Sequence, residues 1–205
     1  MTRTHGMIAT LLASLGVAMP MLATRGFTAF TTDTARAQDV ARRPHRIPSI
    51  PLLDADSVSQ AIVSPGAPRT RIVGFVATRC VTLCARQNGV FQQLQQRIRT
   101  DSLQTRVELV TVSFDPSWDT PRALRYFRVA QRPDPRVWRV LTPADSTQLP
   151  ALLDTFGIRV IREGTELVHN AALHVVSPQG KLVAILPVDD ADGAIAAALT
   201  YSPLR

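Results

Sequence analysis

The chain has 205 residues, of which 45% are apolar, so it is large enough for one globular domain with a terminal extension and is not wholly disordered. Its formal net charge is +7, but the arginines are scattered and form none of the clusters typical of a nucleic-acid-binding face. We therefore expect no nucleic-acid partner. The two cysteines, Cys80 and Cys84, are too few for a disulfide-stapled small fold or a four-cysteine zinc module.

The first 37 residues have the pattern of a secretory signal peptide. Arg3 precedes an uncharged apolar run from Met7 to Ala23, and Ala35-Arg36-Ala37 has the small-x-small pattern of a signal-peptidase site. We expect cleavage after Ala37 and a periplasmic or other extracytoplasmic location. The alternative is an uncleaved membrane anchor, because the run is close to the minimum length of a membrane span. Residues 38–50 lack an apolar period and are predicted to be a linker to a domain over residues 51–205.

Strand and helix patterns alternate along the rest of the chain. The first half is predicted to hold a buried strand at Arg71 to Ala77, a helix at Leu83 to Thr100, a buried strand at Val107 to Phe114 and a helix from Thr120 to Ala130. A strand at Val137 to Leu141 and a helix at Thr147 to Phe156 follow, and then two extended segments at Ile158 to Ile161 and Glu166 to Val168 around Gly164. The last elements are a hairpin at Ala171 to Val176 and Leu182 to Leu186 and a helix at Ala191 to Leu199. This order predicts one α/β domain with a central mixed β-sheet and helices on both faces.

The two cysteines follow the first predicted strand, at the carboxyl end where reactive groups gather in α/β folds. Residues four apart on a helix share one face, with Cα atoms about 6 Å apart, which suits either a disulfide or two thiolates on one metal. Cys80, at the expected helix start, lies near the positive end of the helix dipole, which favours a thiolate. The alternative is a structural disulfide or two inert thiols.

A third metal ligand has to come from one of four histidines. His5 lies in the predicted signal, His45 in the predicted linker, His169 before the late strand and His174 within it. Thiolates with an imidazole suit copper(I) or zinc, and soft thiolates favour copper(I). From the residues alone, a loop role for His169 and a strand role for His174 are at least as common as ligation.

Three segments carry a resemblance to a known family. They are Thr78-Arg79-Cys80-Val81-Thr82-Leu83-Cys84, the segment Val112-Ser113-Phe114-Asp115-Pro116-Ser117-Trp118-Asp119-Thr120-Pro121, and His169 followed by Ala172 to Gly180. In order and spacing they resemble the signatures of the Sco/SenC family, from about Ile72 to Leu186. The resemblance implies a thioredoxin-like fold that holds copper by two cysteines and one histidine and assists assembly of the copper site of cytochrome c oxidase. By position, the implied ligands are Cys80, Cys84 and His169.

The chain also departs from that family's usual pattern at several positions. These are Val81 and Ala85 after the cysteines, where proline is usual, Val168 and Asn170 around the histidine, where an acidic residue and a serine are usual, and Trp118, where a charged residue is usual. Asp115 in the second segment either faces the site or is a turn residue before a proline.

Several functions follow from these observations. The first is a copper metallochaperone that serves the copper subunit of cytochrome c oxidase or another copper or thiol protein. The second is a thiol-disulfide oxidoreductase in which Cys80 attacks a disulfide and Cys84 resolves the intermediate. The third is a thioredoxin-like interaction module whose disulfide is only structural. Peroxidase activity is a weaker fourth option, because the sequence has no recognised peroxide-binding pattern. Side chains alternate faces along a strand, so His169 and His174 are not expected to reach the cysteines together without a bend, and the resemblance to the family selects His169.

Overall fold

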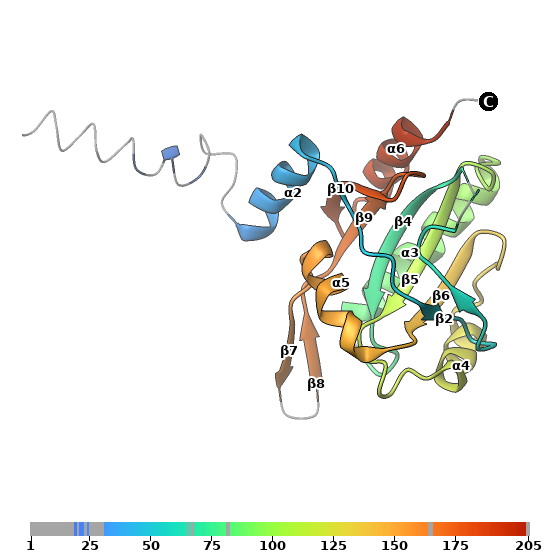
Figure 1. Cartoon of the computed structure of the whole chain (residues 1–205). Helices are drawn as coiled ribbons and strands as arrows, with labels where there is room; N and C mark the ends of the chain where they lie inside the picture. The colour runs from blue at the N-terminus through green and yellow to red at the C-terminus, as the bar shows by residue number, and fades with distance from the viewer. Residues whose placement is uncertain are drawn as a thin grey trace, which may run out of the picture. The chain divides into compact units, whose positions relative to one another are not determined.

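The computed structural model describes residues 19, 21–22, 24, 31–64, 66, 68–80, 83–163 and 166–203 (Figure 1). The chain divides into two units, Met1–Asp39 and Val40–Arg205. Most of the apolar run of the predicted signal lies outside the described residues, and the predicted cleavage site lies in helix α2 (Thr32–Arg42). Within the described residues, no helix is long and apolar enough to cross a membrane. The signal peptide and the alternative anchor therefore stay predictions.

A mixed β-sheet forms the centre of the second unit, with the strand order β1-β10-β9-β4-β5-β6-β2-β3 among the described residues. Its strands are β1 (His45–Arg46), β2 (Leu52–Leu53), β3 (Ser59–Gln60), β4 (Thr70–Val76), β5 (Val107–Ser113), β6 (Trp138–Pro143), β9 (Ala172–Val176) and β10 (Lys181–Pro187). Strands β4, β5 and β6 are parallel, whereas β9 runs antiparallel to β4 and β10 antiparallel to β9. A separate hairpin consists of β7 (Val160–Glu163) and β8 (Glu166–His169).

The helices begin and end close to the predicted positions because their boundary signals are local. They are α3 (Leu83–Thr100), α4 (Pro121–Gln131), α5 (Leu149–Phe156), preceded by a 3₁₀ turn, and α6 (Ala191–Tyr201). Thr120 caps α4, since its side chain accepts the backbone N–H of Ala123. Gly157 ends α5 in the left-handed region with φ 71°, which favours glycine.

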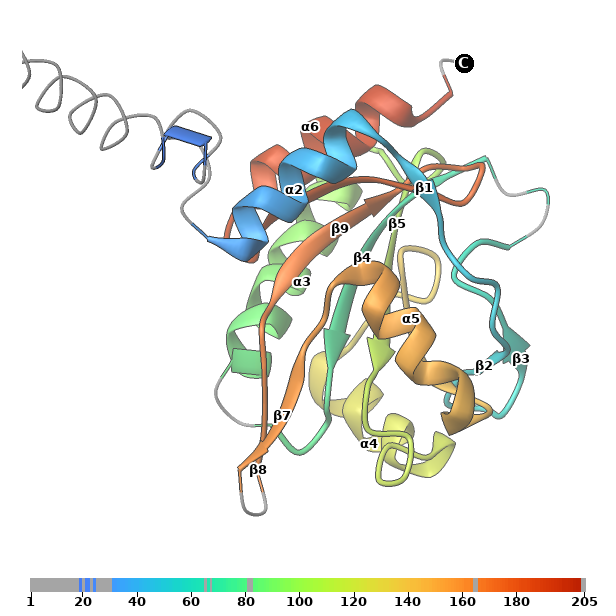
Figure 2. The same ribbon diagram turned by 60° about the vertical axis from the view of Figure 1, so that its left-hand side comes forward.

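Helices cover both faces of the sheet, as predicted. Alternate residues of β4 face opposite sides: Ile72 and Val76 pack in a core with α3, α4 and α6, whereas Val73 and Phe75 pack in a second core with α5. Figure 2 shows α3 and α5 on opposite sides of β4. The arrangement is the mixed α/β sheet that the strand and helix order predicts, and it has the thioredoxin-like fold that the family resemblance implies.

Close packing of α3 on β4 depends on Gly74. A Cβ atom at this position would lie 2.4 Å from the Nε2 atom of Gln87 and 2.8 Å from the ring of Phe91, both on α3. The Gln87 amide donates a hydrogen bond of 3.1 Å to the backbone oxygen of Phe75. This contact fixes the first half of α3, and with it Cys84, against the end of β4.

The segment predicted as a linker, residues 38–50, contains the end of α2 and strand β1. His45 and Arg46 pair with Leu182 and Lys181 of β10. Strands β2 and β3, which extend the other edge of the sheet, are also absent from the sequence prediction. Strands of two residues are too short to show an alternating pattern, so no periodicity could reveal them.

Candidate metal centre

The loop after β4 and the first turn of α3 bring the two cysteines together. The backbone N–H of Cys80 donates to the oxygen of Ala77 over 3.0 Å. Helix α3 begins at Leu83 as predicted, so Cys80 lies before the helix and not at its first residue, and Cys84 occupies the first turn. Both cysteines are free thiols; Cys84 is buried and Cys80 is partly exposed.

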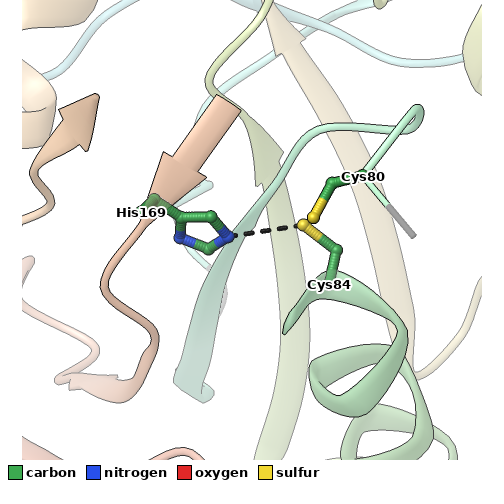
Figure 3. A group of neighbouring side chains, drawn as sticks. All are labelled: Cys80, Cys84 and His169. Atoms are coloured by element: carbon green, nitrogen blue, oxygen red, sulfur yellow. Dashed lines mark hydrogen bonds between the residues drawn. The ribbon is translucent and has the colours of Figure 1, made fainter. Parts of the chain in front are cut away.

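His169 reaches the cysteines from the end of β8. Figures 1 and 2 show the β7–β8 hairpin projecting beyond the end of the central sheet where β4 ends. The Nε2 atom of His169 lies 3.3 Å from the Sγ atom of Cys84 (Figure 3). Its Nδ1 atom lies 2.8 Å from the backbone oxygen of Asn170, and a carbonyl oxygen only accepts, so Nδ1 carries the proton. The lone pair of Nε2 is thus directed at the sulfur atoms.

The ligand atoms of Cys80, Cys84 and His169 all lie within 4.8 Å of one another. Figure 3 shows the two sulfur atoms side by side and the imidazole pointing toward them. Metal bonds to cysteine sulfur and histidine nitrogen are about 2.0 to 2.3 Å long, so donors at this spacing can share one ion. Two thiolates and one imidazole form a donor group that suits copper(I).

Burial sets the protonation of the two inner groups. Burial and a hydrogen bond with Cys80 raise the pKa of the Cys84 thiol far above its ordinary value. Burial also lowers the pKa of His169, against the opposing effect of its bond to Asn170. In the metal-free protein Cys84 therefore keeps its proton and donates it toward a neutral imidazole. A metal ion has to displace that proton.

A buried carboxylate, Asp119, ties the cysteine loop to the loop after β5. It accepts hydrogen bonds from the backbone N–H of Thr78 at 3.0 Å, from the Thr78 hydroxyl, and from the Ser113 hydroxyl at 2.6 Å. Burial raises the pKa of Asp119, and these hydrogen bonds oppose the rise. The sequence analysis assigned no role to Asp119, because its partners lie 6 and 41 residues away and leave no local pattern.

Asp115 occupies a turn and does not belong to the group of possible ligands. Its backbone oxygen accepts the N–H groups of Trp118 and Asp119, at 3.0 and 2.8 Å. Its carboxylate accepts from Ser117 at 2.9 Å and forms an ion pair with Arg79 at 2.9 Å. The Arg79 guanidinium also lies over the Trp118 ring, 5.3 Å from its centroid. Of the two interpretations of Asp115, the structure favours the turn residue.

Asn170 and Phe114 hold the imidazole of His169 in place. The Asn170 side chain accepts the backbone N–H of Arg159 at 2.7 Å and donates to the oxygen of Gly157 at 3.0 Å. The Phe114 ring packs on the imidazole, with 4.6 Å between centroids. Asn170, one of the departures from the family pattern, therefore joins the histidine loop to the end of α5.

His174 lies in the core, away from the cysteines. Its Nδ1 and Nε2 atoms are 3.2 and 3.1 Å from the backbone oxygens of Val73 and Phe156. The structure thus places His169, and not His174, beside the cysteines, as expected. The reason differs from the predicted one, because the two histidines lie on separate strands, β8 and β9. Of the other histidines, His45 is exposed and His5 lies outside the described residues.

Fold and site together define a thioredoxin-like protein with a Cys-x₃-Cys pair and one histidine at the carboxyl end of its central strand. The family profile described as SCO1/SenC matches residues 57–202. The chain belongs to the SCO1/SenC family. No curated protein sequence matches it.

Several solved structures share the fold at low sequence identity. A SCO1/SenC family lipoprotein from Bacillus anthracis has a TM-score of 0.68 and 19% identity, covering 78% of this chain and 98% of that one. BsSco, a member of the Sco family of cytochrome c oxidase assembly proteins with an identified disulfide switch, has a TM-score of 0.66 and 20% identity, and the match covers 80% of this chain and 96% of that one. Bradyrhizobium japonicum ScoI with copper bound has a TM-score of 0.62 and 16% identity, and the match covers 77% of this chain and 99% of that one. These similarities support the thioredoxin-like fold.

Proposed function

We propose that this chain is a copper-binding metallochaperone of the cell envelope, with Cys80, Cys84 and His169 holding one copper(I) ion as cargo. The observation that carries the proposal is the convergence of three ligand atoms from a loop, a helix and a hairpin within 4.8 Å. Membership of a family with copper-bound relatives supports the choice of copper over zinc.

The three ligands differ in how they meet a partner. Cys84 and His169 are buried, whereas Cys80 is partly exposed, so among the three ligands Cys80 is the one that a partner's thiol meets first. Copper transfer is then a ligand exchange that starts at Cys80, where an incoming thiolate replaces the outgoing one and total charge is conserved. The two buried ligands keep the ion in place until the partner supplies further donors.

The proposed acceptor is the copper subunit of cytochrome c oxidase or another copper or thiol protein. The oxidase is supported by the family of BsSco, whose members are named as oxidase assembly proteins. The proposed location outside the cytoplasm is supported by the signal pattern of residues 1–37. Mass spectrometry of the protein from its host is expected to find Gln38 at the mature N-terminus, and an intact Met1 in the membrane fraction would favour the anchor instead.

Anaerobic titration of the reduced protein with copper(I), against a competing chelator, tests the proposal. We expect stoichiometric binding of one ion, lost in Cys80→Ser and in Cys84→Ser. The exposed His45→Ala is the matched control and should bind copper as the unmodified chain does. Absence of stoichiometric binding by the reduced chain would contradict the proposed function.

The different exposure of the two thiols also supports the alternative, a thiol-disulfide oxidoreductase. Cys80 thiolate would attack a partner disulfide and release one partner thiolate, and Cys84 would then displace the second partner thiol and close the Cys80–Cys84 disulfide. The raised pKa of Cys84 slows the second step. Trapping of a mixed disulfide by Cys84→Ser, with unchanged exchange in His169→Ala, would favour this alternative.

A further inference from the structure

A groove of about 490 Å³ opens beside Cys80, within the size range of ligand-binding pockets. One wall comes from the start of α3, with Ala85 and Asn88, and the other from the first three turns of α4. Trp118 lines the end nearest the loop after β5. The groove therefore adjoins the one thiol of the metal centre that a partner can reach.

The groove carries no formal charge, although the chain has 23 basic and 16 acidic residues. No Asp, Glu, Lys or Arg side chain is among its lining residues in the part of the chain that the structure describes. Arg79, which precedes Cys80 in the chain, is paired with Asp115 and lies over the Trp118 ring. A charged segment would lose hydration on entering this groove and gain no opposite charge.

Two exposed aromatic side chains border the groove. Trp118 is 58% exposed and Tyr126 is 65% exposed, and tryptophan and tyrosine are the residues most often found to anchor a protein partner. Both line the same groove as Cys80 and offer apolar ring surface there. This surface favours an occupant with apolar side chains.

Asn88 supplies a polar contact inside the same groove. Asn88 is 9% exposed and lines the groove. A side-chain amide has a donor group and an acceptor, the pair of groups that a peptide backbone matches. The occupant is therefore expected to be an extended peptide rather than an apolar small molecule.

We propose that this groove binds an uncharged, apolar, cysteine-containing segment of the copper acceptor and presents its thiol to Cys80. The proposal rests on the proposed function in one respect, that a partner thiol comes to Cys80. It adds the chemistry of the partner: apolar residues flank the acceptor cysteine, and charged residues are absent there. Trp118 and Tyr126 contact the flanking side chains, and Asn88 bonds the segment's backbone.

A copper-free reaction separates this proposal from copper binding. Short blocked peptides with a central cysteine, present as a thionitrobenzoate mixed disulfide, are mixed with the reduced full chain. The Cys80 thiolate attacks the peptide sulfur, a Cys80–peptide disulfide forms, and coloured thionitrobenzoate leaves with the bonding electron pair. Peptides with leucine and phenylalanine flanks are expected to react about tenfold faster than peptides with aspartate or lysine flanks.

Variants at the groove locate the effect. Tyr126→Ala and Trp118→Ala should each lose most of that tenfold preference, while the 75% exposed Val129→Ala, also on α4, should keep it. A small uncharged thionitrobenzoate disulfide should react with all variants at one rate. Equal rates for the three peptides, full preference in Tyr126→Ala, or an equal slowing of the small reagent would overturn the proposal. Failure of the copper titration would instead refute only the proposed function.

Discussion

The two ends of the central sheet each bury a cluster of polar side chains, and the clusters differ in whether their bonding groups are used. At the carboxyl end of β4 lie Cys80 and Cys84 with His169, whose donor atoms face one another within 4.8 Å. At the amino end, Arg71 of β4 is opposite Glu108 of β5 in the parallel register. The two clusters lie at opposite ends of β4, so a position at the end of this strand does not by itself decide which cluster is a site.

At the amino end the polar groups bind one another. The Glu108 carboxylate accepts from Arg69 at 2.8 Å, from Arg71 at 3.3 Å, and from Arg139 at 2.7 and 3.1 Å. Arg139 also donates to the backbone oxygens of Ala61 and Ile62. Burial lowers the pKa of Arg71, and Glu108 opposes this effect. The cluster therefore holds strands β4, β5 and β6 together at the amino end of the sheet.

At the carboxyl end the inner groups have lone pairs to offer. The Nδ1 proton of His169 is bonded to Asn170, so Nε2 is available, and the sulfur atoms are held only by weak contacts. The two clusters thus differ in the strength of their contacts. Ion pairs hold the polar groups at the amino end, whereas the ligand atoms at the carboxyl end meet in a weak thiol–imidazole contact that a metal ion can replace.

The largest expected effect is on stability and comes from the amino end. Glu108→Gln removes the one carboxylate among three guanidiniums, and loss of one partner of a buried ion pair costs about 3–5 kcal/mol. Denaturant unfolding measures the loss. The copper affinity of the folded Glu108→Gln variant should be unchanged. As a control, Asp56→Asn breaks an exposed ion pair with Arg128 and should hardly alter the denaturant concentration at the midpoint of unfolding. A Glu108→Gln protein as stable as the original would contradict the structural role assigned to the Glu108 cluster.

His169→Ala should weaken copper(I) binding by more than about 100-fold, since loss of a ligand exceeds the 10- to 100-fold effect of a residue that only supports one. The Cys80–Cys84 disulfide should still form without unfolding. His174→Ala is the contrast, because it should lower stability and leave copper affinity unchanged. Competition titration and thermal unfolding of both variants report the two effects, and equal copper loss in both would show that the ligand assignment is wrong.

Copper affinity should rise with pH by about tenfold per unit for each proton that binding displaces. Because burial raises the pKa of Cys84, this thiol stays protonated at neutral pH and has to release its proton. Burial lowers the pKa of His169, so the imidazole is already neutral there and contributes no proton. Competition titrations at a series of pH values measure the slope, and a flat profile around neutral pH would contradict the protonation state assigned to Cys84.

Asn170→Ala should weaken copper binding by about tenfold, at the lower end for a residue that supports a ligand. The backbone oxygen that fixes the Nδ1 proton remains, but the side-chain bonds to Arg159 and Gly157 are lost. Asn170→Asp keeps the acceptor for Arg159 and should recover part of the affinity. A variant with full affinity would mean that the hairpin holds His169 without this link.

Much of the fold could be predicted from the sequence, because its signals are local. The apolar runs of β4 and β5, the spacing of Leu94 and Ile98 on α3, and the Thr120-Pro121 cap each lie within a few residues. The short edge strands could not, since pairs such as His45 with Leu182 join residues far apart in the chain. Their stability comes from the sheet they extend.

The candidate site was predictable only where residue type limited the choice. With two cysteines and four histidines in the chain, few ligand sets exist, and the family resemblance selected His169. The supporting contacts were not predictable: Asp119 bonds Thr78 across 41 residues, and Phe114 packs on a histidine from a distant hairpin.

X-ray absorption at the copper edge of the copper(I)-loaded protein gives the most direct test of the ligand assignment, because it reports the atoms bound to the ion. The arrangement of Cys80, Cys84 and His169 predicts two sulfur ligands and one imidazole nitrogen, with the nitrogen contribution lost in His169→Ala and retained in His174→Ala. A spectrum with sulfur ligands alone, or one unchanged by His169→Ala, would contradict the account.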